Sequence, residues 1–419
     1  MFEQLKEGIW LMSAIKNICA AKKLDLRGNS SLEVSVELES GHRGVGFAPL
    51  TLDLNTAITD ESILDDIKTV NQIIFKALKG KDALDQQGLD KIILNVSEKS
   101  GGSTLKNATI AVSIAIAKAA SSYCKLPIYR YIGGANKNLF PMPLSTVIRG
   151  GFDVNNKINI KEFILVPVGF RNFKDSIYGS SKVFNKIGEL LEEHGRSTNI
   201  QNGYISDLNG DLEALEIICD AINGCGYNLG DDFFIGLNVS ASEWKTKQGR
   251  YKLPKEIKLL SSEQIGDYLF ELCQKYPIIF IEDPLGRRDY EGYRKLKNRM
   301  TDVKIVGNID IEDILEKLQT GAYSDVANAV VVSLKDIRTL SELMNLVELS
   351  RQASCEVIMS DRSLNKENSL IADIIIGLGI KHVKIGTPIV ADRVCKFKRF
   401  LELEEFFNER MRSASPWKY

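Results

Sequence analysis

Alternation of apolar and polar positions is clearest near the start of the chain. Residues 32–38, LEVSVEL, alternate strictly, which predicts a strand with one buried face. Residues 107–124 are rich in Ala, Ser and Ile, which predicts a closely packed and mostly buried helix. A glycine-rich stretch at 133–138, GGANKN, is the best linker candidate. These patterns indicate a small α+β unit that ends near residue 135.

From about residue 139 onward, apolar runs alternate with amphipathic runs. The apolar runs predict buried strands at 162–168, 233–239, 278–282, 303–307, 329–334, 356–360 and 382–385. Helical periodicity lies between most of them, at 212–222, 262–275, 311–318 and 340–352. Regular alternation of this kind favours a closed (β/α) barrel over an open doubly wound sheet. The chain has neither a glycine-rich dinucleotide loop nor a P-loop, which weakens the open alternative.

Composition excludes several functional classes. The 419 residues are 44% hydrophobic and 26% charged with a formal net charge of −1, so the charge balance gives no reason to expect nucleic acid or an anionic membrane as a partner. The seven cysteines contain no C-x-x-C pair and the three histidines lie far apart in the sequence. This pattern indicates reduced thiols in a cytoplasmic protein, with no zinc site. We expect no signal peptide, because the N-terminus carries acidic residues early and lacks an apolar core of sufficient length. We expect no membrane-spanning helix, because no apolar run reaches about 18 residues.

The segment 276–284, YPIIFIEDP, carries the strongest chemical signal. An apolar strand ends there in Glu282 and a second carboxylate, as barrel strands do when they deliver acidic groups to the mouth of a site. Other predicted strands end in Asn238, Asn308 and Ser333, where a metal-dependent site requires carboxylates and a base. The pattern indicates an active-site scaffold from which most of the chemistry has been removed.

Ordered landmarks along the chain resemble the enolase family of Mg²⁺-dependent lyases. They are MSAIK at 12–16, LRGN at 26–29, LPIYRYIGG at 126–134, KEFILVPVG at 161–169, SE at 242–243, YPIIFIEDP at 276–284, KIG at 384–386 and DR at 392–393. The resemblance implies an α/β fold with an enolase-type (β/α)8 TIM-like barrel that begins ββαα and a smaller N-terminal α+β cap domain. It also implies a homodimer, or a heterodimer with an enolase. The expected organisation is an N-terminal extension at 1–11, the cap domain at 12–135, the barrel at 136–411 and a C-terminal tail at 412–419.

The resemblance places the family's metal ligands on Asn238, Glu282 and Asn308, of which only Glu282 keeps a carboxylate. Asn offers a neutral oxygen, which does little to offset the dehydration of Mg²⁺. One interpretation is a rebuilt, weak metal site. The other, which we favour, is relief of carboxylate repulsion when no metal is bound. Asp310 lies two residues past Asn308, but about 6–7 Å farther along a continuing strand. We expect no functional cofactor, with weak Mg²⁺ binding as the alternative.

The proton-transfer groups that the resemblance implies are replaced as well. The base position falls on Ser333 and the general-acid position on Gln201, and neither side chain exchanges a proton readily near neutral pH. Lys335 is two residues beyond Ser333, so in a continuing strand its side chain would lie on the same face but farther along the strand. The family's active-site histidines become Asp153 and Asp361.

Part of the family's polar set is retained, at Glu162, Glu282, Arg362, Ser363 and Lys384. Glu282 and Lys384 are either a surviving ligand and cation or a buried ion pair kept for structure, and we favour the ion pair. Arg362 with Ser363 has the donors to bind a phosphate or carboxylate, with Lys384 as a further substrate-binding candidate. Alternatively, Arg362 forms a salt bridge with one of the new acids.

The first hypothesis is therefore a non-catalytic enolase homologue, a structural or scaffolding subunit of a larger cytoplasmic or cytoskeletal assembly. Simultaneous loss of base, acid and metal charge leaves little rate. One alternative is a weak phosphopyruvate hydratase, which converts 2-phosphoglycerate to phosphoenolpyruvate in glycolysis. Another is a sensor that binds a phosphate or carboxylate without turnover. The terminal stretches 1–11 and 411–419 are candidate docking segments for a partner, or simply frayed ends.

Overall fold

The computed structural model describes residues 12–25, 28–48, 60–99, 105–135, 139–307, 311–361, 369–387 and 391–407. The chain divides into two compact units. Unit 1 comprises Met1–Asn138, Ser333–Glu348 and Asp361–Gly379, and unit 2 comprises Leu139–Val332, Leu349–Ser360 and Ile380–Tyr419. Because these units group residues by contact and not by continuity of the chain, the domain boundaries expected from the sequence stay a prediction.

Unit 1 is built on a three-stranded antiparallel sheet in the order β1-β2-β3. Its strands are β1 Ile15–Leu24, β2 Ser30–Leu38 and β3 Arg43–Phe47. The alternation in β2 is the one read from the sequence, because Val34 and Val36 are buried while Glu33 and Ser35 are half-buried. One face of the sheet therefore belongs to the core of the unit.

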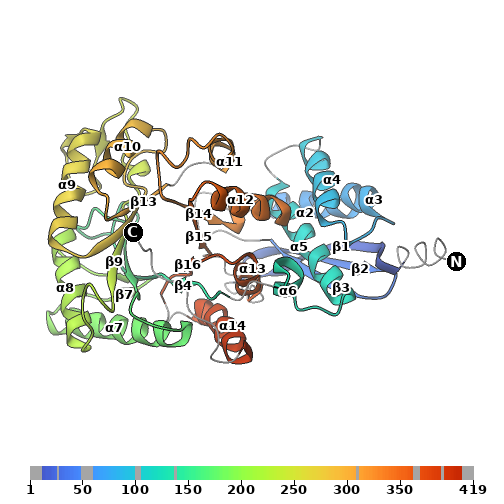
Figure 1. Cartoon of the computed structure of the whole chain (residues 1–419), viewed down its shortest axis with the longest axis horizontal. Helices are drawn as coiled ribbons and strands as arrows, with labels where there is room; N and C mark the ends of the chain where they lie inside the picture. The colour runs from blue at the N-terminus through green and yellow to red at the C-terminus, as the bar shows by residue number, and fades with distance from the viewer. Residues whose placement is uncertain are drawn as a thin grey trace. The chain divides into compact units, whose positions relative to one another are not determined.

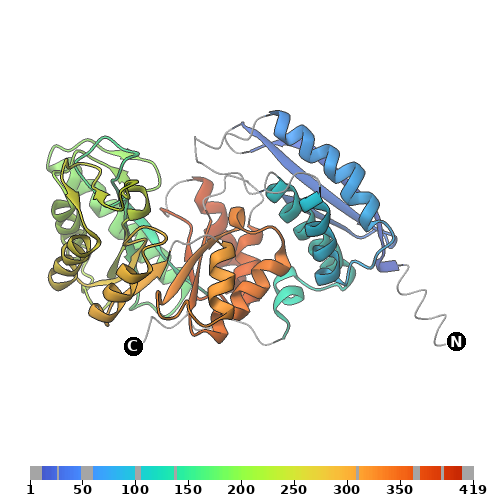
Figure 2. The same cartoon turned by 90° about the horizontal axis from the view of Figure 1, so that it is seen from above.

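Helices cover that buried face. They are α2 Asp60–Lys68, η2 Thr69–Ile74, α3 Phe75–Leu78 and α5 Lys106–Tyr123. Behind them, α4 Gln86–Lys99 and α6 Ile128–Gly133 pack against α5, and α13 Leu370–Leu378 packs against α6. Figure 2 shows the continuous run from α2 to α3, in blue, lying along the strands. The small-residue helix α5 packs directly on β3, because a Cβ at Gly44 or Gly46 would lie 2.1 Å from a backbone oxygen of α5.

Unit 2 is built on a curled sheet in the order β4-β16-β15-β14-β13-β12-β9-β6-β5-β8-β7. The strands are β4 Met142–Pro143, β5 Ser145–Arg149, β6 Glu162–Val166, β7 Asn199–Ile200, β8 Tyr204–Ile205, β9 Phe234–Asn238, β12 Ile278–Glu282, β13 Lys304–Gly307, β14 Ala329–Ser333, β15 Glu356–Ser360 and β16 His382–Lys384. Only Leu144 separates β4, which pairs with β16, from β5, which pairs with β6. The strands from β16 to β6 therefore begin and end beside the same short stretch of chain, residues 142–149, so that the sheet curls round on itself.

Helices lie on the outside of this sheet, as Figure 1 shows for α7 to α10. They are α7 Phe173–Glu193, α8 Asp211–Gly224, α9 Ser262–Lys275, α10 Tyr290–Arg299, α11 Ile311–Gln319 and α14 Ala391–Phe407, with α12 Leu340–Gln352 divided between the two units. The short elements are the hairpin of β10 Tyr251–Lys252 with β11 Leu259–Leu260, and the 3-10 turns η4 Ala241–Glu243 and η5 Leu334–Asp336. No helix in the described part of the chain is long and apolar enough to cross a membrane.

The order of elements agrees with the ββαα start that the resemblance implies. Strands β5 and β6 are antiparallel, α7 and α8 follow them, and β9 pairs with β12 in parallel. Every strand predicted between 162–168 and 382–385 overlaps an observed one. Apolar side chains from many of these strands form one buried cluster, made by Met142, Leu144, Ile164, Val166, Ile279, Phe280, Val306, Ala329 and Ile358.

Candidate functional site

A buried polar cluster, here called the Lys384 cluster, forms where four strands of unit 2 meet. It consists of the buried side chains of Glu162, Asn238, Glu282 and Lys384, from β6, β9, β12 and β16, and of the half-buried Asn202. The strand register pairs Asn238 with Glu162 on one side and with Glu282 on the other. Because β6 runs antiparallel to β9, its first residue lies beside the last residue of β9, at the same edge of the sheet as the last residue of β12. Of the strand ends named in the sequence analysis, this register brings Asn238 and Glu282 side by side.

The ammonium group of Lys384 lies between two carboxylates. Its Nζ is 2.6 Å from Glu282 Oε2 and 3.1 Å from Glu162 Oε2. The three side chains are at most 7% exposed. Asn238 Nδ2 donates to Glu162 Oε2 at 2.8 Å. Buried charges are tolerated when they are paired and hydrogen-bonded, and this cluster meets that condition.

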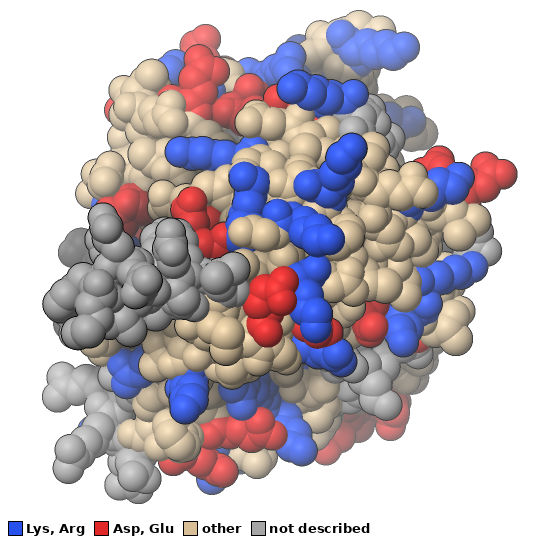
Figure 3. All heavy atoms as spheres, turned by 90° about the vertical axis from the view of Figure 1, so that its right-hand side faces the viewer, with Lys and Arg blue, Asp and Glu red and all other residues tan. Residues whose placement is uncertain are grey.

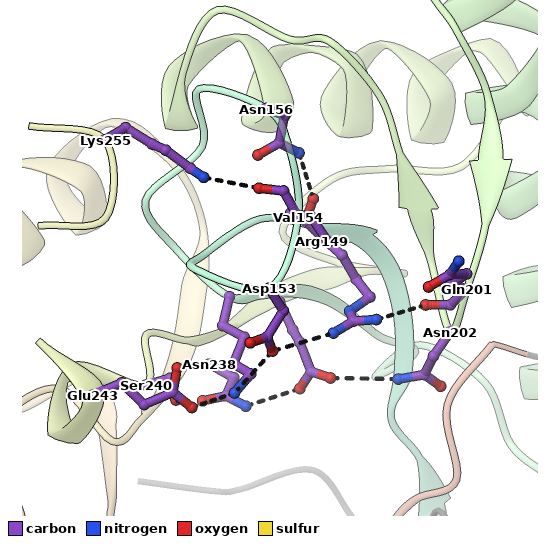
Figure 4. A network of polar contacts seen from close by, with 12 residues as sticks. Arg149, Asp153, Val154, Asn156, Gln201, Asn202, Asn238, Ser240, Glu243 and Lys255 are labelled. Carbon is purple, nitrogen blue, oxygen red and sulfur yellow. Dashed lines mark hydrogen bonds and ion pairs between the residues drawn. The ribbon is translucent and has the colours of Figure 1, made fainter. Parts of the chain in front are cut away.

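Asn202, and not Gln201, presents its side chain to the cluster. Asn202 Nδ2 donates to Glu162 Oε1 at 3.4 Å, whereas Gln201 is exposed and offers its main-chain oxygen to Arg149 (Figure 4). Asn202 has a φ of 59°, in the left-handed region that Asn adopts more readily than most residues. An Asn-Gly pair, here Asn202-Gly203, is the sequence signal for such a backbone.

A second ionic network, here called the Lys161 cluster, lies next to the first along the chain. Lys161 is paired with Glu243 and lies 3.5 Å from Asp153, and Arg149 lies 3.8 Å from Asp153 (Figure 4). Burial lowers the pKa of Lys161, but the hydrogen bond to Glu243 and the charges of the nearby carboxylates outweigh it and raise the pKa. Lys161 is therefore a cation at neutral pH. Asp153, at a position where the resemblance implies an active-site histidine, thus forms ion pairs with Lys161 and Arg149.

The predicted base position, Ser333, is used to end a strand. Ser333 and Asp336 form a reciprocal capping box around η5, in which Ser333 N donates to Asp336 Oδ2 at 3.3 Å. Strand β14 ends at Ser333, so Lys335 lies in the 3-10 turn and is exposed. The strand parity expected for Lys335 does not apply, because the strand does not continue.

Asp283, the residue after Glu282, is buried and hydrogen-bonded to the neighbouring turn. It is fully buried, with a φ of 50°. Its Oδ1 accepts a 2.6 Å hydrogen bond from Ser242 Oγ, which ties the turn after β9 to the end of β12. Of the remaining predicted residues, Asp361 is buried in unit 1. Arg362, Ser363, Asn308 and Asp310 lie outside the described residues.

Comparison with known families identifies this scaffold. The model of the enolase C-terminal TIM barrel domain matches residues 137–415, and that of the enolase N-terminal domain matches residues 15–132. The chain belongs to the enolase family. The family and the fold class expected from the sequence are thereby confirmed. Because one fold hosts many chemistries, the activity of this enolase-family protein has to be argued from its side chains.

Enolase-family membership implies Mg²⁺, and the donor set of the Lys384 cluster fits this ion poorly. Mg²⁺ prefers anionic oxygen ligands in octahedral geometry. Glu282 is bound to the Lys384 ammonium, and Asn238 is neutral and directs its Nδ2 donor to Glu162. Within the described ranges, no group of three or more His, Cys, Asp or Glu side chains is placed to hold a metal ion.

Proposed function

We propose that this enolase-family protein does not catalyse the dehydration of 2-phosphoglycerate, and that it serves as a structural or scaffolding subunit of a larger cytoplasmic or cytoskeletal assembly. The observation that carries the first part is the bonding of Lys384 to both Glu162 and Glu282. A cation tethered to the chain neutralises the carboxylates, so an external metal ion has to displace an ammonium group that is already desolvated.

Missing proton-transfer groups support the same proposal. An enolase removes a proton next to a carboxylate, which requires a base near the reacting carbon. Ser333 is held in a capping box and Gln201 is exposed. Asn202, which does face Glu162, carries an amide that transfers no proton. Loss of a single proton-transfer group typically costs about 10²–10⁴-fold in rate.

The charges of the two clusters disfavour an anionic substrate. Their cations are Lys384, Lys161 and Arg149, and their carboxylates are those of Glu162, Glu282, Asp153 and Glu243. Three positive and four negative charges sum to −1 for these described groups. A phosphorylated carboxylate brings further negative charge, so binding there requires cations that this set does not supply.

Retention of the whole scaffold supports the structural part of the proposal. Both enolase domains are matched along the chain, and the sheet of unit 2 keeps a continuous apolar cluster. We include in the proposal a homodimer, or a heterodimer with an enolase, and no nucleic acid or membrane partner. Basic side chains gather across the centre of the face that Figure 3 shows and acidic ones lie mostly toward its edges, but the formal net charge of the whole chain is −1.

The first test is the formation of phosphoenolpyruvate from 2-phosphoglycerate, with excess Mg²⁺ and a verified active enolase in parallel. We expect a rate at least about 10⁴-fold below that of the active enzyme. Turnover that scales with protein and persists through repurification would overturn the proposal. Calorimetric titration with Mg²⁺ adds a second readout: the wild type is expected to bind weakly or not at all, and Lys384→Met combined with Asn238→Asp to bind more tightly.

Two further measurements separate scaffold from sensor. A saturable rise in Tm with phosphoglycerates, abolished by Arg362→Ala, would favour an anion sensor. Cross-linking and pull-down with the full chain and with chains lacking residues 1–11 or 411–419 test the docking role of the terminal segments. If the captured partners are the same for all three chains, these segments do not dock partners.

A further inference from the structure

Residues 150–161, here called the strap, join β5 to β6 without a helix or strand of their own. A connection of this length is ordinarily among the least stable parts of a domain. In this protein, side chains from other segments hold the strap in two places, its C-terminal part and a tip at Asp153. The contacts at these two places differ in strength.

The C-terminal part of the strap is anchored to the start of α8. One carboxylate oxygen of Asp211 accepts hydrogen bonds from the backbone N–H groups of Asn159 and Ile160, each at 2.9 Å. The other accepts from the Tyr268 hydroxyl. Asp211 is buried. Hydrogen bonds between a buried carboxylate and backbone N–H groups are charge-assisted and strong.

Lys255, from the hairpin segment between β10 and β11, holds the strap a second time. Its backbone N–H donates to Asn159 Oδ1 at 3.1 Å, and its Nζ donates to the main-chain oxygen of Val154 at 2.8 Å (Figure 4). Asn156 Nδ2 donates to the main-chain oxygen of Arg149, at the end of β5, at 2.9 Å. Within the strap, Asn156 Oδ1 accepts from Ile158 N at 3.3 Å. These bonds fix the backbone from residue 154 to residue 160.

The tip of the strap has only looser contacts. Asp153 is 51% exposed, and its distances of 3.5 Å to Lys161 and 3.8 Å to Arg149 are longer than ordinary hydrogen bonds. Lys161 also pairs with Glu243, which accepts a hydrogen bond from Ser240 Oγ at 3.0 Å. Ion pairs of this exposure are weakened by salt.

We propose that the strap is a clamp with two parts. Asp211 and Lys255 hold residues 154–160 permanently, whereas the tip at Asp153 is held by its ion pairs with Lys161 and Arg149, which break at high ionic strength. Lys161 immediately precedes Glu162, so release of the tip changes the surroundings of the Lys384 cluster while the rest of the strap stays closed. The clamp does not depend on whether the site turns over a substrate.

The test uses the full chain and two readouts. Amide hydrogen exchange at Ile158, Asn159 and Ile160, whose N–H groups are bonded, reports on the fixed part. The acylation rate of the Lys161 amine, followed by mass spectrometry, reports on the tip. The exposed Lys258 provides an internal reference for acylation and, as Lys258→Met, a matched control for Lys255→Met.

We expect Asp153→Asn, or about 0.5 M NaCl in the wild type, to raise Lys161 acylation about threefold without changing exchange at 158–160. Lys255→Met is expected to accelerate that exchange about tenfold, because a hydrogen bond from a charged group is lost. Lys258→Met is expected to change neither readout.

The proposal is overturned if salt leaves Lys161 acylation unchanged in the wild type. It is also overturned if Asp153→Asn accelerates exchange at 158–160 as much as Lys255→Met does. The salt series needs no variant, so it decides even if a variant fails to fold.

Discussion

Two lysines of unit 2 each lie between two carboxylates, but in different surroundings. Lys384 is bound to Glu162 and Glu282, and these side chains are at most 7% exposed. Lys161 is paired with Glu243 and Asp153, which are 40% and 51% exposed. Each lysine faces the same kind of group, a pair of carboxylates, and the most evident difference between the two is burial.

Burial changes what each lysine does. In the Lys384 cluster the charges have lost water, so each depends on its partners, and removal of one leaves an uncompensated charge. In the Lys161 cluster, water and salt can replace a lost partner. The outer face of the unit 1 sheet gives the exposed extreme, where Glu37 accepts hydrogen bonds from Lys16 and Arg43. The same ionic chemistry is thus structural at Lys384 and releasable at Lys161.

The largest effect is expected from Lys384→Met. The variant keeps much of the side-chain volume but leaves two buried carboxylates without their cation, so we expect a loss of about 3–5 kcal/mol in the free energy of unfolding. Urea unfolding followed by circular dichroism measures it. Adding Glu282→Gln to Lys384→Met is expected to recover part of the loss, because one of the two charges is removed. If the double variant is less stable than the single one, packing and not charge explains the effect.

Asp66 is a largely buried carboxylate outside the two lysine clusters, so its titration reports on burial itself. Burial, with a smaller contribution from the charge of Asp65, raises the pKa of Asp66 to about 7. The unfolded chain releases this proton near its ordinary pKa of about 3.9, so between these values the folded state binds more protons and wild-type stability falls as the pH rises.

Asp66→Asn removes this dependence. We expect the variant to match the wild type near pH 4 and to exceed it at pH 8 by about 1–3 kcal/mol. Urea unfolding of both proteins at a series of pH values measures the difference. A constant difference across the series would show that Asp66 does not titrate in this range.

Much of the fold could be predicted from periodicity, since strand and helix patterns depend on nearby residues. The helix at 262–275 has the bounds of α9, where Ser261 and Gln264 form a capping box, and the strand at 278–282 has the bounds of β12. The proximity of Asn238 and Glu282 could be anticipated for a related reason, because parallel strands end at one edge of a sheet. The place of Glu162 could not, because it begins an antiparallel strand.

Pairings in the site depend on contacts that sequence patterns do not record. Lys161 and Glu243 are 82 residues apart in the sequence, and neither is unusual in its local context. The resemblance places the acid position on Gln201, but a left-handed backbone turns the neighbouring Asn202 toward Glu162. Lys335 keeps strand parity only if β14 continues, and the capping box at Ser333 ends it. Local backbone geometry therefore decided which of two adjacent residues faces the cluster.

Lys161→Met is the direct counterpart of Lys384→Met in the comparison. We expect a loss of about 1 kcal/mol, because water and counterions can solvate the carboxylates that remain. Urea unfolding at about 0.05 M and 0.5 M NaCl is the measurement, and the loss is expected to shrink at the higher concentration. A loss as large as that of Lys384→Met, and insensitive to salt, would show that the Lys161 cluster behaves as a buried one.

The smallest effect is expected from Arg43→Gln in unit 1. Hydrogen bonds from Lys16 and then from Arg43 lower the pKa of Glu37, and a lowered carboxylate pKa adds stability above the unfolded pKa that is lost as the pH falls. Arg43 is 71% exposed, so water screens this contribution and the urea midpoint is expected to stay within error. The pKa of Glu37, measured by NMR titration, is expected to rise toward its ordinary value while Lys16 still holds it below. A destabilisation equal to that of Lys161→Met would mean that exposure does not separate these ion pairs, and the contrast between the two lysine clusters would then need another cause, such as hydrogen-bond geometry.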